Sequence, residues 1–408
     1  MEKPPQHQTK PMNQMMKGED DQIGELPDDE DDRVSKLPDD ILVRVLSLLR
    51  YRDAVRTASV SRRWEHVVCT QLPDLNFSMS LLGYRTSKGT PSEQRVQSME
   101  RTLRRRCCHH SVRTLGLVYR KDEPMECRYA DEFIALANAR RLTLDIQCAR
   151  GLPDEDAGAW CVGLPLATAE LHVLPYWYAV RPPHIRGPGA GALRSLTLKG
   201  LTVLRQEFLD TDLPSLEDLR IGECTIAASI SIASDAMPRL KHLDIADVAV
   251  MTNDTKAGID VLADELRTLR VSCFWGSKTE PASDEVEMFR LPARFRASFT
   301  AYSSFRLRAP KLRVFDWRCC HPDEVRVESV GRLSEVVVEL AAGRKPRTND
   351  EELSYVTVDQ RDKLMTDILQ GLMPGLQPLT WRKVKRKCVQ RDDRWVCFEI
   401  TNAMRLHS

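Results

Sequence analysis

The chain has 408 residues and nearly balanced charge, with 60 Lys and Arg against 59 Asp and Glu. Its length is enough for roughly two to three domains. The charge balance excludes a global basic field that would bind nucleic acid or an anionic membrane through net charge alone, so a local surface must select the partner.

The sequence gives no sign of a membrane span or a secretory signal. No apolar run approaches the roughly 18 residues that a transmembrane helix needs, and residues 1–33 are polar. The 12 cysteines are therefore expected to be reduced thiols. We expect a protein of the nucleus, the cytoplasm or both, with no membrane partner.

Residues 1–32 form a polar segment that becomes acidic from Glu19 onward. Such a composition cannot bury enough apolar surface to offset the conformational entropy that is lost on folding. We therefore predict a disordered acidic tail over residues 1–32.

A compact helical block is predicted over residues 33–75. Pro38 suits the first turn of a helix, and Asp39 and Asp40 suit its positive end. Ser61 is placed to cap a later helix. Three short helices make only a small core, so the block is expected to pack against a partner. The apolar stripe of its first helix is wider than a core-facing side needs and contains Ile41, Leu42, Val45, Leu46, Leu48 and Leu49.

From residue 112 onward a spacing recurs: apolar, two variable residues, apolar, one variable residue, apolar. One clear copy is Leu216, Leu219 and Ile221. Successive copies lie 21 to 29 residues apart, which is the leucine-rich-repeat signature, and one gap of 46 predicts a degenerate repeat near residues 288–299. The middle apolar residues, called anchors here, are Leu115, Leu142, Leu171, Leu196, Leu219, Leu243, Leu269, Phe315 and Val336.

The repeats predict the fold class. Each repeat offers one strand that cannot bury its apolar side alone, so stacked repeats share a core and form a curved parallel sheet. We expect an α/β protein in which a three-helix domain and a connecting helical segment over 76–111 precede a leucine-rich-repeat solenoid, or horseshoe, over 112–342. A C-terminal capping element is predicted over 343–408, with a helix followed by a hairpin around Asp392.

The variable strand positions between the repeated apolar residues form the predicted target-binding surface. Side chains alternate between the two faces of a strand, so these residues point away from the core. In a solenoid they line the concave face, which usually binds the partner. The set is His172, Thr197, Lys199, Asp218, Arg220, His242, Asp244, Thr268, Arg270, Asp316 and Arg318.

Residues 33–69 closely resemble the F-box. The resemblance rests on Leu37-Pro38-Asp39-Asp40-Ile41-Leu42, Ala54-Val55-Arg56-Thr57 and Ser59-Val60-Ser61-Arg62-Arg63-Trp64, and with the repeats it points to the plant F-box and leucine-rich-repeat family. It implies that the F-box binds a Skp-type linker, which joins it to a cullin, while the repeats hold a protein target for ubiquitination and degradation. The implied linker-binding set is Leu37, Pro38, Ile41, Leu42, Val45, Leu46, Leu49, Val60 and Trp64.

No catalytic, cofactor or metal site is predicted. Cys107-Cys108-His109-His110 lacks the two-residue gap by which paired ligands converge on a tetrahedral ion. The sequence also contains no phosphate-binding Gly-Lys-Ser/Thr loop and no Gly-x-Ser-x-Gly nucleophile elbow. We therefore expect a non-catalytic adaptor.

Two other interpretations stay open. One is an F-box scaffold or transcriptional partner that acts outside the ligase. The other is a nucleic-acid binder that uses the basic runs Arg101–Arg106 and Arg382–Lys387, for which strongly salt-dependent binding would be the mark. The balanced net charge disfavours the second interpretation, although Arg382–Lys387 is also a candidate nuclear-localisation signal.

Overall fold

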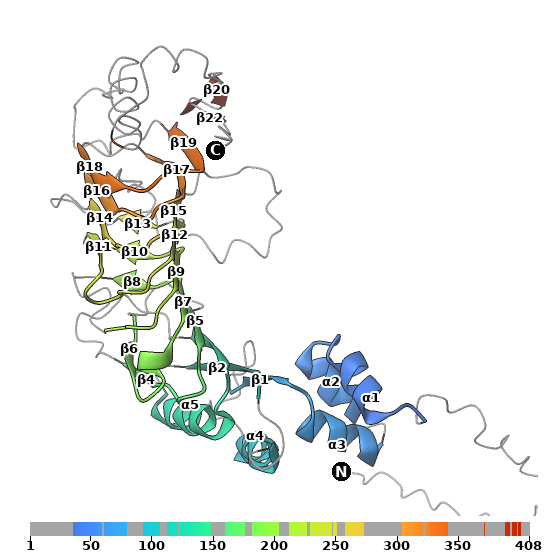
Figure 1. The fold of residues 1–408 in the computed structure, drawn as a ribbon. Helices are drawn as coiled ribbons and strands as arrows, with labels where there is room; N and C mark the ends of the chain where they lie inside the picture. The colour runs from blue at the N-terminus through green and yellow to red at the C-terminus, as the bar shows by residue number, and fades with distance from the viewer. Residues whose placement is uncertain are drawn as a thin grey trace, which may run out of the picture.

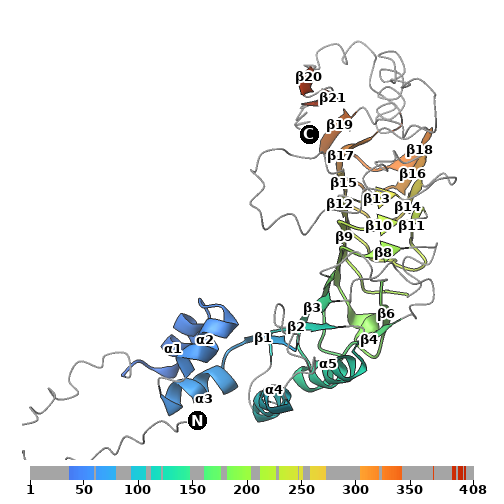
Figure 2. The same cartoon turned by 180° about the vertical axis from the view of Figure 1, so that it is seen from behind.

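The structure, a computed structural model, places a block of helices beside a long array of strands (Figure 1). The strands follow one another along the array in chain order, as the view from behind also shows (Figure 2). The fold is mixed α/β, as predicted. The residues described are 36–58, 61–79, 93–106, 112–120, 123–147, 160–175, 182–203, 212–226, 229–246, 248–250, 258–272, 304–320, 324–341, 371, 388–391, 394–397 and 399–400.

The N-terminal block contains α1 (Asp39–Leu46), α2 (Tyr51–Thr57) and α3 (Arg62–Thr70). Pro38 directly precedes α1, and the Ser61 hydroxyl caps α3 by accepting a hydrogen bond from the Trp64 backbone N–H at 3.2 Å. The predicted three-helix arrangement is confirmed. Its own core is small and consists of Leu42, Leu46, Ala54, Val67, Val68 and Leu72.

After this block come the strand β1 (Asp74–Ser78) and the helices α4 (Glu93–Arg106) and α5 (Pro124–Ala137); α5 lies between the second and third strands of the main sheet. α4 lies in the connecting segment predicted over residues 76–111. β1 belongs to the main sheet, so the sheet begins before residue 112, where the repeats were predicted to start. Leu72, Leu75 and Phe77 carry the repeat spacing, but 40 residues separate Leu75 from the next anchor, Leu115, and hide this copy from a search for a regular period.

The main sheet has eleven strands among the described residues, in the order β1-β2-β3-β5-β7-β9-β12-β15-β17-β19-β22. Neighbouring strands are parallel up to β19, and β22 pairs with β19 in the antiparallel direction. Beyond β1 the strands are β2 (Thr114–Arg120), β3 (Arg141–Gln147), β5 (Glu170–Pro175), β7 (Ser195–Lys199), β9 (Asp218–Gly222), β12 (His242–Ala246), β15 (Thr268–Ser272), β17 (Val314–Cys320), β19 (Glu335–Ala341) and β22 (Glu399–Ile400).

All nine anchors occupy one row across this sheet. Leu115 pairs with Leu142 in direct register, and each later anchor is the register partner of the one before it, ending with Phe315 and Val336. The anchors are buried except Val336, which is half-buried at the end of the row. The spacing read from the sequence therefore marks a continuous ladder of apolar side chains on one face of the sheet.

Shorter parallel sheets close the other sides of the core, and their buried Ile232 and Val261 extend it. The first contains β11 (Ile230–Ala233), β14 (Gly258–Leu262), β16 (Ser304–Ala309) and β18 (Glu324–Val330). The others contain β8 (Thr202–Val203), β10 (Thr225–Ile226) and β13 (Ala249–Val250), and β4 (Cys161–Gly163) with β6 (His184–Arg186).

The expected horseshoe curvature is absent, because the described sheets are not curled (Figure 1). Strands lie about 4.8 Å apart in any sheet, whereas a helix is about 10 Å wide. Helices behind every strand would widen the back of each repeat, but β11, β14, β16 and β18 place strands there instead. Front and back then have the same spacing, so the predicted concave face is a flat face, called the outer face below.

The expected degenerate repeat near residues 288–299 lies outside the described residues. However, β15 pairs directly with β17, so that Leu269 lies beside Phe315. This pairing leaves no room for another main-sheet strand between them, and the expectation of an extra repeat strand there is wrong.

The C-terminal region contains the predicted hairpin, formed by β20 (Cys388–Arg391) and β21 (Arg394–Cys397). β22 follows it and pairs with β19 at the end of the main sheet. Apart from Gly371, the helix predicted before the hairpin lies outside the described residues. Among the residues described, no helix combines the length and apolar character that a membrane crossing requires.

Candidate functional site

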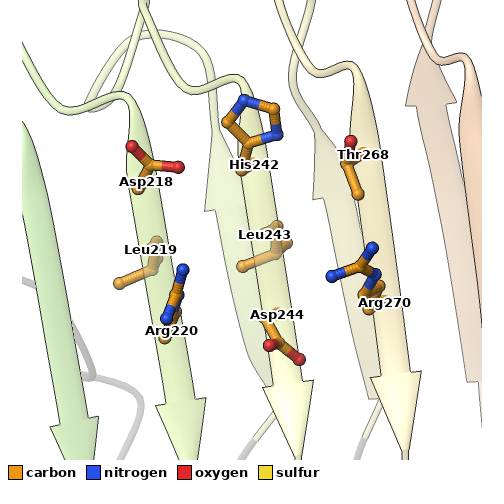
Figure 3. A pocket seen from close by; sticks show the side chains of 8 residues that line it. All are labelled: Asp218, Leu219, Arg220, His242, Leu243, Asp244, Thr268 and Arg270. Carbon is orange, nitrogen blue, oxygen red and sulfur yellow. The ribbon is translucent and has the colours of Figure 1, made fainter.

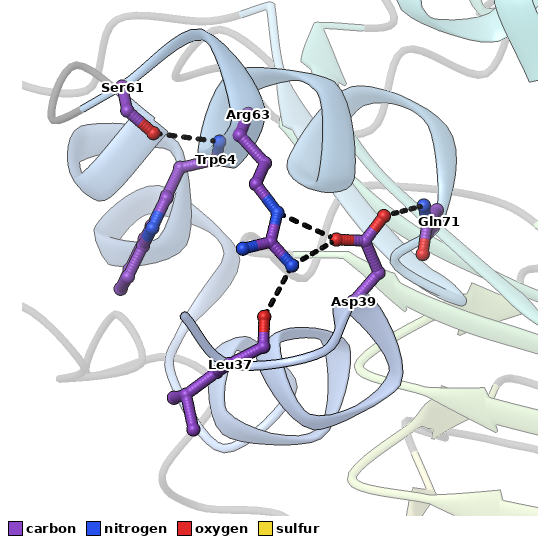
Figure 4. Close-up of polar contacts among 6 residues, drawn as sticks. All are labelled: Leu37, Asp39, Ser61, Arg63, Trp64 and Gln71. Atoms are coloured by element: carbon purple, nitrogen blue, oxygen red, sulfur yellow. Dashed lines mark hydrogen bonds and ion pairs between the residues drawn. The ribbon is translucent and has the colours of Figure 1, made fainter. Parts of the chain in front are cut away.

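An ion pair fixes the start of the N-terminal block (Figure 4). The Arg63 guanidinium on α3 donates to Asp39 Oδ1 on α1 at 2.9 Å through Nε and 2.6 Å through Nη2, and it also reaches the Leu37 carbonyl oxygen. Gln71 Nε2 donates to the other carboxylate oxygen at 3.3 Å. These hydrogen bonds, Arg63 first, hold the pKa of Asp39 below its usual range. The contacts tie the residues just before α1, and the start of α1 itself, to α3.

The same block exposes large apolar side chains that its small core does not use. On α1, Ile41 and Val45 are one helical turn apart and beside the buried face of Leu42. The exposed residues, here called the apolar patch, are Ile41 (38%), Val45 (43%), Leu48 (84%), Leu49 (41%) and Val55 (44%).

The structure divides the predicted linker-binding set. Leu42 and Leu46 are 0% and 1% exposed, so they stabilise the helical core and offer no surface to a partner. Pro38 is exposed, Leu37 and Trp64 are half-buried, and Val60 lies outside the described residues. Ile41, Val45 and Leu49 belong to the apolar patch.

The sequence reasoning did not assign Leu48 and Val55 to the linker-binding set. Leu48 continues the i, i+4, i+7 spacing of Ile41 and Val45 but lies two residues beyond the end of α1, so helical periodicity alone does not fix its position. Val55 lies on α2 beside the buried Ala54, and a seven-residue helix has too little periodicity to show its exposure from sequence.

Comparison with known proteins identifies this block. Residues 34–72 match the F-box-like family model, so the chain contains an F-box-like domain. Domains of this family generally bind Skp-type linker proteins. A search of curated proteins found no match.

A second candidate surface lies on the outer face of the main sheet. Arg220, Asp244 and Arg270 are direct register partners on β9, β12 and β15. The same row continues to His172 and Thr197 on one side and to Asp316 on the other. The register therefore brings the predicted binding residues together, with Asp218, His242 and Thr268 in a neighbouring row and with Lys199 and Arg318 in a third.

A shallow pocket of about 330 Å³ opens on this face between β9, β12 and β15 (Figure 3). Its polar lining comes entirely from the predicted set, while Leu219 and Leu243 lie buried beneath it. The polar lining residues are Asp218, Arg220, His242, Asp244, Thr268 and Arg270.

The charged side chains of this surface differ in their pairing. Asp316 and Arg318 form an ion pair at 2.9 Å, and Lys199 approaches Glu223 at 3.6 Å. Within the described part of the chain, Arg220, Asp244 and Arg270 form no such pair. The middle of the surface therefore presents charged groups that a partner can reach without first breaking an ion pair.

At the β3–β5 end, the outer face buries polar atoms. Asp145 Oδ1, Gln147 Nε2 and His172 Nε2 are buried, with no hydrogen-bond partner among the residues described. Burial is the main cause that lowers the pKa of His172 and raises that of Asp145. Asp145 and Gln147 were not predicted as site residues, although strand alternation places both on the face of Thr143, the register partner of His172.

The basic run Arg101–Arg106 is divided between surface and interior, with Arg101, Arg104 and Arg105 exposed and Arg106 buried. Arg106 is 2% exposed and donates to backbone carbonyls, including that of Val68 at 2.6 Å. Arg104 pairs with Glu100 at 2.7 Å. The other basic run, Arg382–Lys387, lies outside the described residues.

The described residues hold no cluster of three or more side chains suited to a metal ion. Cys107-Cys108-His109-His110 lies outside them.

Proposed function

We propose that the protein is a non-catalytic substrate adaptor of a Skp–cullin–F-box ubiquitin ligase. Its F-box-like domain binds the Skp-type linker and, through it, a cullin. The outer face of the main sheet binds a protein target for ubiquitination and degradation, and other subunits carry out the transfer chemistry. The protein acts in the nucleus, the cytoplasm or both.

The observation that carries this proposal is the apolar patch on the F-box-like domain. Leu48 is 84% exposed, and four further large apolar side chains are between 38% and 44% exposed. Several exposed large apolar side chains on one small domain favour association with a partner. A Skp-type linker is the partner that this family of domains generally binds.

We further propose that the strand array is a leucine-rich-repeat solenoid of the type found in plant F-box proteins. Support comes from the spacing of the anchors and from their shared row across the sheet. Flat sheets with strands on the back make it a straight variant of that architecture.

Co-purification tests the adaptor function. The full chain is expressed together with a Skp-type linker and a cullin, and each is sought in the pull-down. Recovery of both supports the ligase adaptor, whereas the linker without the cullin favours a scaffold outside the ligase. Nucleic acid that is retained at low salt and lost at high salt would favour the nucleic-acid alternative.

A further inference from the structure

Three neighbouring strands present alternating charges on the outer face. Arg220, Asp244 and Arg270, together called the charge row, lie side by side in register and come from β9, β12 and β15 (Figure 3). Both arginines are exposed, and Asp244 is half-exposed. Because no described residue forms an ion pair with them, a bound partner can pair with all three charges without displacing an ion pair within the protein.

The sign pattern disfavours a polyanion. The pocket contains two arginines and two aspartates, so its formal charge is balanced when His242 is neutral. A phosphate held between Arg220 and Arg270 would sit over Asp244, whose like charge repels it. A partner that carries a negative, a positive and a negative charge in the same order is attracted by each of the three residues of the charge row.

The spacing favours a helix that lies across the strands. Two strand steps, from Arg220 to Arg270, span about 9.6 Å. In a helix, residues i and i+7 lie on the same face about 10.5 Å apart along the axis, and residue i+3 or i+4 lies near the midpoint between them. In an extended segment, two steps along one face span about 13 Å, which leaves the outer charges out of register.

We propose that the charge row binds an α-helical segment of the protein target, with an acidic, a basic and an acidic residue at i, i+3 or i+4, and i+7. The acids pair with Arg220 and Arg270, and the base pairs with Asp244. This inference rests on the proposed function, since it names the class of target that the outer face selects.

The test is a selection from a displayed library of helical peptides with randomised charged positions. The bait is the full chain in complex with its Skp-type linker. Enriched peptides should carry the acid–base–acid pattern at helical spacing. The charge-inverted variant Arg220→Glu/Asp244→Lys/Arg270→Glu should lose these peptides by about tenfold and enrich the base–acid–base pattern instead.

A matched control is Arg239→Glu, an exposed site on the turn between β11 and β12, which should leave the selected pattern unchanged. The inference is overturned if polyacidic peptides are enriched, or if charges alternate at the spacing of an extended segment. It is also overturned if both baits enrich the same peptides, or if the wild type enriches the acid–base–acid pattern no more than the inverted variant does. Because the bait is purified through its linker, failure of the proposed function appears earlier, as a complex that does not form.

Discussion

Arg106 at the end of α4 donates a hydrogen bond to the carbonyl oxygen of Val68 on α3 at 2.6 Å. The same guanidinium reaches the carbonyl oxygens of Cys69, also at 2.6 Å, and Leu72. The last carbonyls of a helix have no intrahelical partners, and a cation complements the helix dipole there. One buried side chain therefore joins the F-box-like domain to the helix that follows it.

Replacing Arg106 by Met should lower the free energy of unfolding by about 2–4 kcal/mol, because the buried carbonyl oxygens lose their charged donor. Chemical denaturation of the full chain measures the loss. Arg105→Met, at the exposed neighbouring position, should change stability by no more than about 0.5 kcal/mol. Equal effects of the two substitutions would contradict the capping role.

The main-sheet strands from β2 to β19 could be predicted because their spacing is local in the sequence, whereas β1 was missed. Leu219 and Leu243 carry it, and the structure places them side by side. The flat shape could not be predicted, because it depends on the short strands behind the sheet. Those strands, β11, β14, β16 and β18, form the back of the array by pairing with one another across long stretches of sequence, which local spacing does not reveal.

The candidate sites were predictable to different degrees. Strand alternation was sufficient to place Arg220 and Asp244 on the outer face. The burial of Leu42 and Leu46 was not predicted, because the apolar residues of the first helix cover more of its surface than the core can bury. The sequence does not show which of them face the core. The tertiary contacts of α3 decide that question.

The Asp39–Arg63 pair predicts a pH dependence of stability. The folded pKa of Asp39 lies below its unfolded value of about 3.8, so the stabilisation is complete above that value and is lost as pH falls through the folded pKa. Between pH 5 and pH 2 the wild type should therefore lose more stability than Asp39→Asn. Urea midpoints across this range measure the difference, and parallel curves would contradict the prediction.

The apolar patch predicts a substitution that separates linker binding from folding. Val45→Asp adds charge at an exposed position, so it should weaken recovery of the Skp-type linker while leaving the melting temperature near that of the wild type. Leu42→Ala, in the buried core, should cost about 2–5 kcal/mol of stability. Undiminished linker recovery by Val45→Asp would count against the patch as the docking surface.

The anchors fill the core that the repeats share, so removing one of them should destabilise the array. Leu243 is 1% exposed and pairs in register with Leu219 and Leu269, so Leu243→Ala should leave a cavity and lower stability by about 2–5 kcal/mol. Exchanging the neighbouring charges of the outer face in Arg220→Asp/Asp244→Arg should change stability by only about 0.5 kcal/mol. Calorimetry of both variants, with linker pull-down alongside, separates the two faces. If the charge exchange unfolds the array as readily as the cavity does, the outer face contributes to folding and the division between core and binding surface fails.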